Sequence, residues 1–228
     1  KKLEDYIKRG GNLLWLADPG PLHGLEPLAE LLGVEFQRGV IVDPVSQALT
    51  GASATFYVAT EYGAHPIVQN FTLTTLFPDA VALSQRAPKD WRAQELLRTG
   101  PSAWSETAAL TDKIQFDKGQ DIAGPLGFGI TLTHKLEAGE QRVAVIGDGD
   151  FLSNTFLGNG GNLEFGMNLV NWAASDDGQV NLPARIAPDL RLDLSQPAQL
   201  LIALGFLVVL PLMLVASGAV IWWRRRRA

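Results

Sequence analysis

The sequence predicts an α/β domain with an open, mostly parallel sheet flanked by helices, followed by one C-terminal transmembrane helix. Short helical and strand patterns alternate in the first third of the chain, which is typical of strands joined by crossover helices. The strand candidates are continuous apolar runs, and parallel strands covered on both faces have this pattern. The chain then ends in a long uncharged run followed by four arginines.

These patterns divide the 228 residues into four parts. We expect an extracytoplasmic α/β domain over 1–174, a linker over 175–199, a transmembrane helix over 200–223 and a cytoplasmic arginine tail over 224–228. The first part is long enough to bury a core of its own. Lys1 opens directly on a helix, so we interpret the chain as the C-terminal part of a longer protein.

The N-terminal third begins with a helix over residues 1–9, where Leu3, Tyr6 and Ile7 share one face. Gly10 and Gly11 end this helix, because glycine accepts the left-handed conformation found after a helix end. The patterns that follow predict a strand over 13–17, a helix over 25–32 closed by Gly33, and strands over 34–36 and 40–42.

The rest of the domain has one clear pair of elements and a less regular middle. Residues 142–146 form the clearest strand in the chain, and a helix is expected over 161–174. Between the first third and this pair, the predicted elements are a short helical turn at 65–68, buried strand pieces at 80–83 and 96–97, a loop over 101–126, and a strand over 128–133.

The C-terminal segment has the composition of a membrane span. Residues 200–223 contain no charged side chain, and about 20 apolar residues are enough to cross a hydrocarbon core. Trp222 and Trp223 suit the membrane interface, and Arg224, Arg225, Arg226 and Arg227 give a positive-inside signal. We therefore expect a cytoplasmic C-terminus, an inner-membrane location, and a periplasmic or extracytoplasmic position for everything before the span.

Charge and composition exclude several classes of function. The net charge is −5 and the four terminal arginines contribute +4, so the preceding residues carry −9. Such an acidic chain is unsuited to nucleic acid, whose binding depends on neutralised phosphates. The chain has no cysteine, which excludes disulfides, thiolate nucleophiles and cysteine-ligated metals.

The best candidate site is the loop after the strand at 142–146. In open α/β sheets, ligands bind beyond the carboxyl ends of the strands. That position holds the polar residues Asp148, Asp150, Ser153 and Asn154, and Asp18 follows the strand at 13–17 and is expected at the same edge. We mark these five as candidate ligand-binding residues.

Two interpretations of this loop remain open. Carboxylate and amide oxygens can hold a hard cation such as Ca²⁺ or Mg²⁺. The same residues also suit a local role, in which Asp148 and Asp150 shape the turn and Asn154 caps it. We assign neither a metal nor a cofactor.

Other catalytic patterns are missing from the sequence. The glycines at 147–149 lack the dinucleotide-binding spacing, and there is no P-loop lysine. None of His23, His65 and His134 has a second histidine at metal-ligand spacing. No serine lies in a nucleophile-elbow motif, so we assign no catalytic residue.

Two long segments resemble a known family. Residues 3–20, LEDYIKRGGNLLWLADPG, resemble the helix, Gly-Gly turn and strand that open amidotransferase-like or flavodoxin-like α/β domains. Residues 142–174 resemble the late strand, loop and helix of the same domains. Together with the terminal span, they resemble the C-terminal part of auxiliary proteins of uncharacterised ABC transport systems, a family that includes gliding-motility subunits.

The resemblance implies a non-enzymatic accessory subunit that works with an ABC permease and ATPase and is anchored in the lipid bilayer. The domain would bind a partner or ligand outside the cytoplasmic membrane. Amidotransferase activity is not implied, because that activity requires a cysteine. Two alternatives stay open: a metal-dependent envelope hydrolase using Asp18, Asp148 and Asp150, and a purely structural membrane anchor.

Overall fold

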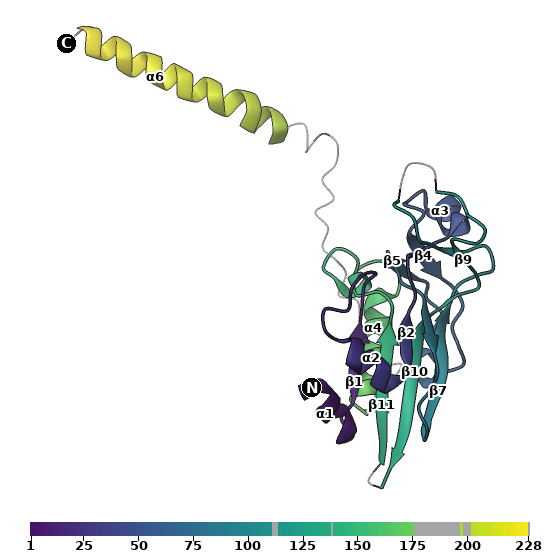
Figure 1. Cartoon of the computed structure of the whole chain (residues 1–228). Helices are drawn as coiled ribbons and strands as arrows, with labels where there is room; N and C mark the ends of the chain where they lie inside the picture. The colour runs from purple at the N-terminus through teal and green to yellow at the C-terminus, as the bar shows by residue number, and fades with distance from the viewer. Residues whose placement is uncertain (111–113, 138, 176–196, 198–201, 228) are drawn as a thin grey trace. The chain divides into compact units, whose positions relative to one another are not determined.

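The computed structural model of the chain describes residues 1–110, 114–137, 139–175, 197 and 202–227 (Figure 1). It divides into two compact units, Lys1–Ala184 and Arg185–Ala228. We call these the globular unit and the C-terminal unit. The predicted linker over 175–199 lies almost entirely outside the described residues.

The globular unit is rich in short strands. Its described helices are α1 (Lys2–Lys8), α2 (Glu26–Leu32), α3 (Pro44–Thr50) and α4 (Asn162–Ala173), with 3-10 helices η1 (Pro66–Val68) and η2 (Asp150–Leu152). Its described strands are β1 (Leu13–Leu16), β2 (Val34–Phe36), β3 (Val40–Val42), β4 (Phe56–Ala59), β5 (Thr75–Pro78), β6 (Leu83–Gln85), β7 (Trp91–Arg98), β8 (Trp104–Glu106), β9 (Ile122–Ala123), β10 (Gly127–Leu136) and β11 (Gly139–Ile146).

The largest described sheet has the strand order β1-β11-β10-β7. Strand β1 pairs with β11 in parallel, whereas β10 pairs antiparallel with both β11 and β7. Three smaller antiparallel sheets join β2 to β6, β4 to β5, and β8 to both β3 and β9. The fold is therefore mixed and β-rich.

The prediction of an open, mostly parallel, amidotransferase-like or flavodoxin-like sheet is wrong. Strands β10 and β11 form a hairpin in which Leu136 pairs with Gly139, and so short a connection can only join antiparallel strands. The apolar runs of β1 and β11 report burial on both faces. They do not report strand direction.

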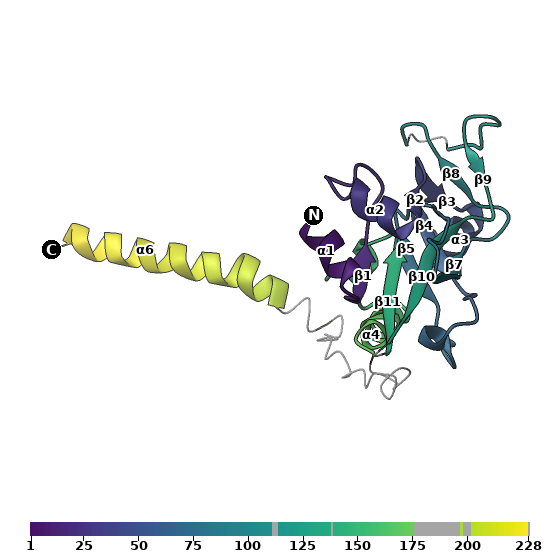
Figure 2. The same cartoon turned by 60° about the horizontal axis from the view of Figure 1, so that its bottom comes forward.

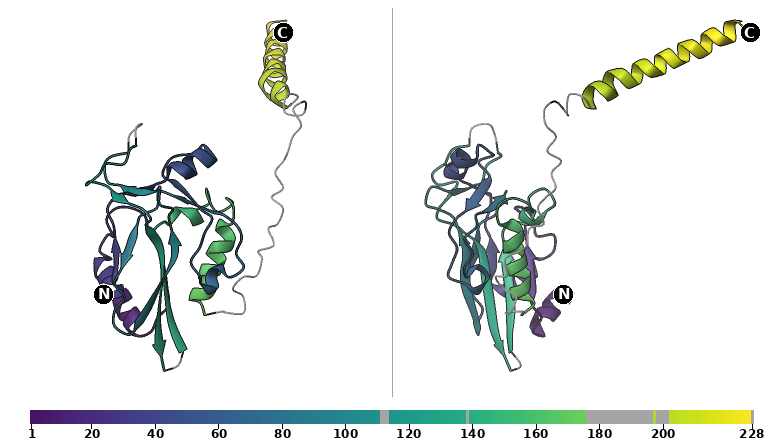
Figure 3. Two further views of the ribbon diagram at one scale, coloured as in Figure 1. Left: turned by 90° about the vertical axis from the view of Figure 1, so that its right-hand side faces the viewer. Right: turned by 180° about the vertical axis from the view of Figure 1, so that it is seen from behind.

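That burial on both faces is visible in two hydrophobic clusters separated by the sheet. Val143 and Val145 of β11 pack in the cluster that contains α1 and α2 side chains, and Ala144 and Ile146 pack in the cluster that contains α4. Helix α2 lies in front of the sheet in Figure 1, and α4 lies in front when the molecule is seen from behind (Figure 3). Figure 2 shows α4 on the side of β11 opposite to α1 and α2.

Several predicted elements are present with small changes. Helix α2 ends at Gly33, whose φ of 64° is left-handed, as expected of a closing glycine. The turn at 65–68 is η1, and the helix at 161–174 is α4. Residues 80–82 are buried, but the strand begins only at Leu83.

Other elements were not predicted. The segment 101–126, expected to be a loop, contains β8 and β9, and α3, β4 and β5 fall where no element was predicted. Asp43 begins α3 by accepting hydrogen bonds from the backbone N–H groups of Val45 and Ser46, at 3.2 and 3.1 Å. An aspartate followed by proline is a common helix start, so this signal was available.

Among its described residues, the C-terminal unit contains the apolar helix Ile202–Arg227, which is long enough to cross a membrane. It consists of a π-helical turn, η3 (Gly205–Val209), and α6 (Leu210–Arg227), after an initial turn at 202–204. Pro211 lacks the N–H that a regular helix requires, and the π turn lies directly before it. The aromatic and basic side chains at the C-terminal end of the helix interact with one another. The Cζ atoms of Arg226 and Arg227 lie 4.4 and 4.1 Å from the ring centroids of Trp222 and Trp223, respectively.

Candidate functional site

The loop after β11 lies beside the residue that follows β1, as the sequence predicts for parallel neighbours. The backbone N–H of Gly149 donates a 2.7 Å hydrogen bond to Oδ1 of Asp18. Asp18 itself is exposed. The two strand ends are therefore linked through one carboxylate, and part of the hydrogen-bonding capacity of Asp18 is already used within the protein.

Asp148 is the most unusual carboxyl group in this loop. Its side chain is fully buried, Oδ1 accepts a 2.9 Å hydrogen bond from the N–H of Phe151, and Oδ2 has no hydrogen-bond partner among the described residues. Burial, reinforced by the negative charges of Asp18 and Asp150, raises the pKa of Asp148 to about 8. Asp148 is therefore mainly a neutral acid at pH 7.

The remaining three candidates lie on the outer part of the loop. Asp150 is exposed and begins η2, Ser153 follows its end, and Asn154 is exposed. The N–H of Ser153 donates to the carbonyl oxygen of Asp150 at 2.9 Å. These contacts form a local turn within residues 148–154. Asp18 reaches the same loop from the end of β1.

The residue that holds this loop in place is Asn162, at the start of α4. Its Oδ1 accepts a hydrogen bond from the N–H of Leu76 at 2.8 Å, and its Nδ2 donates to the carbonyl oxygens of Leu76, Phe151 and Phe156 at 3.0 to 3.1 Å. Asn162 is fully buried. Asn162 therefore holds the loop and connects it to β5.

The described residues contain no group of three or more His, Cys, Asp or Glu side chains placed to hold a metal ion. The loop over residues 148–154, which we call the carboxylate loop, shows the physical reason. Asp148 is buried and neutral, whereas Asp18 and Asp150 are exposed on either side of it. A shared hard cation requires charged oxygens that face one point.

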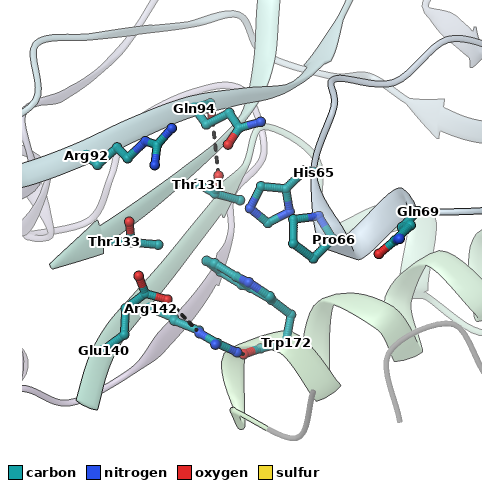
Figure 4. A pocket seen from close by; sticks show the side chains of 10 residues that line it. All are labelled: His65, Pro66, Gln69, Arg92, Gln94, Thr131, Thr133, Glu140, Arg142 and Trp172. Atoms are coloured by element: carbon teal, nitrogen blue, oxygen red, sulfur yellow. Dashed lines mark hydrogen bonds and ion pairs between the residues drawn. The ribbon is translucent and has the colours of Figure 1, made fainter. Parts of the chain in front are cut away.

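A more convergent site lies on the α4 side of the sheet. It is a cavity of about 470 Å³ between η1, the C-terminal end of α4 and strands β7, β10 and β11 (Figure 4). The residues that line it are predominantly polar: His65, Pro66, Gln69, Arg92, Gln94, Thr131, Thr133, Glu140, Arg142 and Trp172. We call this the sheet cavity. None of the five carboxylate-loop candidates lines it.

The floor of the sheet cavity is set by strand register. Thr133 of β10 pairs with Arg142 of β11 on one side and with Arg92 of β7 on the other. Directly paired residues point to the same face of a sheet. The two arginines and the threonine therefore form one row across three strands, on the face that carries α4.

One arginine of this row is tied to the protein. Arg142 forms an ion pair with Glu140 (Nε to Oε2, 3.2 Å), donates from Nη1 to the Trp172 carbonyl oxygen at 3.1 Å, and places its Cζ 5.6 Å from the Trp172 ring centroid. The side chain of Arg92 is exposed and has no ion-pair or hydrogen-bond partner among the residues that the structure describes.

The wall of the sheet cavity is aromatic. His65 and Trp172 meet edge to face with ring centroids 5.0 Å apart. His65 begins η1, and its Nδ1 accepts a 3.3 Å hydrogen bond from the N–H of Ile67. Burial, with a smaller effect of the Arg142 charge, lowers the pKa of His65 to about 4. His65 is therefore neutral at pH 7, with its proton on Nε2.

A second cavity, of about 580 Å³, lies near α3 and has the opposite charge. Its lining includes Asp43, Glu61 and Glu95 but only one basic residue, Arg98, whose Nε lies 3.4 Å from Oε1 of Glu95. Asp43 is already occupied in capping α3 and in accepting a bond from Ser102. We therefore regard the sheet cavity as the better candidate.

Sequence patterns alone did not indicate the residues of the sheet cavity. His65 was expected only as part of a turn, and no role was predicted for Arg92, Thr133, Arg142 or Trp172. A partial signal was present, because alternation along the strands at 128–133 and 142–146 separates Thr131 and Thr133 from the apolar residues between them. The pairing with Arg92 could not be inferred without the strand order.

Comparison with known proteins places the globular unit in a family. A solved structure, the mmIFT52 N-terminal domain, is similar with a TM-score of 0.54 and 18% identity, over 75% of this chain and 68% of that chain. At this identity the likeness concerns the fold alone. No curated protein matches the chain. The family profile described as "ABC-type uncharacterized transport system" matches residues 1–174, and the chain therefore belongs to this family of auxiliary components of ABC transport systems.

Proposed function

We propose that this protein is a non-enzymatic, membrane-anchored subunit of an ABC transport system whose globular unit binds a partner or ligand outside the cytoplasmic membrane. Family membership supports the association with transporter components. The proposed membrane anchoring rests on the apolar helix Ile202–Arg227, whose last four residues are arginines. A specific role in gliding motility stays a prediction.

The dimensions of the helix support an anchoring role. The uncharged part, residues 202–223, spans about 33 Å at the rise of an α-helix, close to the roughly 30 Å of a bilayer hydrocarbon core. Its described side chains are almost all exposed within the chain. An 18-residue segment of the helix has a mean hydropathy of 2.5. An exposed apolar helix of this length requires an apolar environment.

Its charge distribution supports the proposed orientation. The four arginines at 224–227 occupy one end of the helix, and positive residues are retained on the cytoplasmic side. Trp222 and Trp223 lie one turn earlier, where indole rings favour the interface. The orientation puts the acidic globular unit outside, in the periplasm or its equivalent, and the C-terminus in the cytoplasm.

The chemistry of the globular unit supports a binding role. The chain has no cysteine nucleophile. The buried carboxyl of Asp148 is neutral and closed off by the Phe151 N–H and its own loop, so it is poorly placed to activate water. The polar, solvent-connected residues gather in the sheet cavity instead.

Topology can be tested cleanly because the natural chain contains no cysteine. We expect Asn159→Cys, at an exposed loop position, to react with a membrane-impermeant maleimide in intact spheroplasts. We expect Arg227→Cys to react only after permeabilisation. The cysteine-free parent is the matched control, and the reverse labelling pattern would contradict the proposed orientation.

Partner association requires a separate experiment. The full chain, purified in mild detergent, should recover an ATPase and a multi-span permease. Packing against the permease is expected to use the small-residue patch Ala216, Ser217, Gly218 and Ala219, so Gly218→Leu should reduce recovery, whereas Leu212→Ile should not. Recovery of neither subunit would favour the purely structural anchor.

A further inference from the structure

The sheet cavity is larger and more polar than loose packing between helix and sheet requires. Its volume of about 470 Å³ lies within the range of small-molecule sites. Its floor is a strand face on which the apolar pattern stops, because Thr131, Thr133 and Gln94 replace the leucines and valines found on the opposite face. Figure 4 shows these side chains and the His65 ring directed toward one space.

Three side chains offer hydrogen-bond donors to this space. Arg92 contributes an exposed guanidinium without a partner among the described residues, and Thr133 contributes a hydroxyl beside it. His65 contributes its Nε2 hydrogen, because Nδ1 is occupied as an acceptor. A site rich in donors matches a ligand rich in acceptor oxygens.

The charges at the cavity define how negative that ligand can be. Arg92 and Arg142 are positive and Glu140 is negative, so the lining carries a net charge of +1. Glu140 already neutralises Arg142 through the 3.2 Å ion pair. One guanidinium therefore remains to be matched, which favours a single carboxylate over a phosphate dianion.

We propose that the sheet cavity binds a small organic carboxylate, with the carboxylate on Arg92 and Thr133 and the organic part against Trp172. A guanidinium holds a carboxylate through two parallel N–H to O bonds. The Trp172 indole, which contacts the His65 ring and Arg142, lines the cavity and is its aromatic apolar contact. This proposal specifies the ligand for the binding role proposed above and depends on that role.

The carboxylate can come from a free acid or from the end of a peptide chain. Both sources present the same group to Arg92, so the experiment includes both. Glutarate, acetate and benzoate represent free acids, with glutaramide as the uncharged analogue. N-acetyl-triglycine and its amide represent a chain end with and without the charge.

Binding is measured by titration calorimetry on the full chain in detergent micelles. We expect at least one carboxylate probe to bind and its neutral analogue to bind at least about tenfold more weakly. Arg92→Gln should weaken that carboxylate by about tenfold, and Thr133→Val by a few-fold. The matched control is Arg38→Gln, an exposed arginine that does not line the cavity.

Glu140→Gln provides a test with the opposite sign. Removing this negative charge should strengthen carboxylate binding by a few-fold, which a loss of structure would not do.

The proposal is overturned if wild type and Arg92→Gln bind every carboxylate probe equally or not at all, or if inorganic phosphate binds more tightly than all of them. Circular dichroism on each variant confirms that the fold is retained. Cysteine labelling is independent of these titrations, so failure here leaves the proposed membrane topology standing.

Discussion

The carboxylate loop after β11 and the sheet cavity both contain several polar residues but use them in opposite ways. In the loop, Asp18 and Asp148 accept hydrogen bonds from backbone N–H groups. Asn162 accepts one bond from a backbone N–H and donates three to backbone carbonyl oxygens. In the cavity, Arg92 and Thr133 face solvent-connected space. The polar groups of the loop therefore complete the fold through hydrogen bonds to the backbone, whereas the cavity includes Arg92 and Thr133, which remain open to a ligand.

The largest test of this contrast is Asn162→Ala. The substitution leaves the buried N–H of Leu76 and the carbonyl groups of Phe151 and Phe156 without their partner, and each unsatisfied buried group costs about 1–3 kcal/mol. We expect the free energy of unfolding to fall by about 3–5 kcal/mol. Urea denaturation measures it, with exposed Asn159→Ala as the control. A loss within the control's range would show that the loop is not held by Asn162.

Asp148→Asn tests the buried neutral acid. The folded-state pKa of Asp148 is about 8, above the value of about 4 in an unfolded chain. Its contribution to stability is therefore complete below pH 4 and is lost as pH rises toward 8. The maximum slope is about 1.4 kcal/mol per pH unit.

The asparagine variant should remove that slope. Urea denaturation between pH 4 and 8 compares the variant with wild type, and the exposed neighbour Asp150→Asn is the control. Identical pH profiles for Asp148→Asn and wild type would show that Asp148 is ionised in the folded protein.

His65 at the cavity wall should give a slope of the opposite sign. Its folded-state pKa of about 4 lies below the unfolded value of about 6.5, so stability is lost as pH falls from 6.5 to 4. The total loss is at most about 3 kcal/mol. Because the Asp148 and His65 slopes cancel between pH 4 and 6.5, the single variants are needed to reveal them.

His65→Asn keeps a side chain able to cap η1 and removes the titrating group. In an Asp148→Asn background, acid destabilisation between pH 6.5 and 4 should therefore disappear with His65→Asn. His134→Asn, on the same sheet but outside the cavity, should leave it unchanged. If the acid slope persists without His65, another group is responsible.

The smallest expected effect is that of Arg92→Gln on stability. Arg92 is exposed and without a partner among the described residues, so the free energy of unfolding should change by no more than about 0.5 kcal/mol. Thermal unfolding of wild type and variant measures this. A loss above 1 kcal/mol would mean that Arg92 supports the fold, and the contrast between loop and cavity would weaken.

Local elements were predictable where the pattern was strong. The apolar runs at 13–17 and 142–146, the glycine after α2 and the helix at 161–174 each correspond to a described element. Short strands were predicted unevenly, because two to four residues provide little periodicity: β2 and β3 were predicted, whereas β4, β5, β8 and β9 were not. The prediction of parallel strand directions was wrong, because continuous apolar runs record burial on both faces and carry no information on strand direction.

The candidate site was likewise predictable from the sequence only in part. The closeness of Asp18 to the loop after β11 followed from one parallel strand pair, which the sequence indicated. The sheet cavity depends on the pairing of β7 with β10, which places Arg92 beside Thr133 although the two are distant in the chain. No local pattern encodes that contact.

By itself, the sequence determined the apolar terminal helix with its arginines, the lack of cysteine chemistry and the burial of β1 and β11, because each follows from the composition of a continuous segment. Only the tertiary structure decided that the sheet is mixed, that Asp148 is buried and neutral, and that Arg92, Thr133 and Arg142 form one row. Those properties depend on strand register and on the distance between groups far apart in the chain, which composition does not specify.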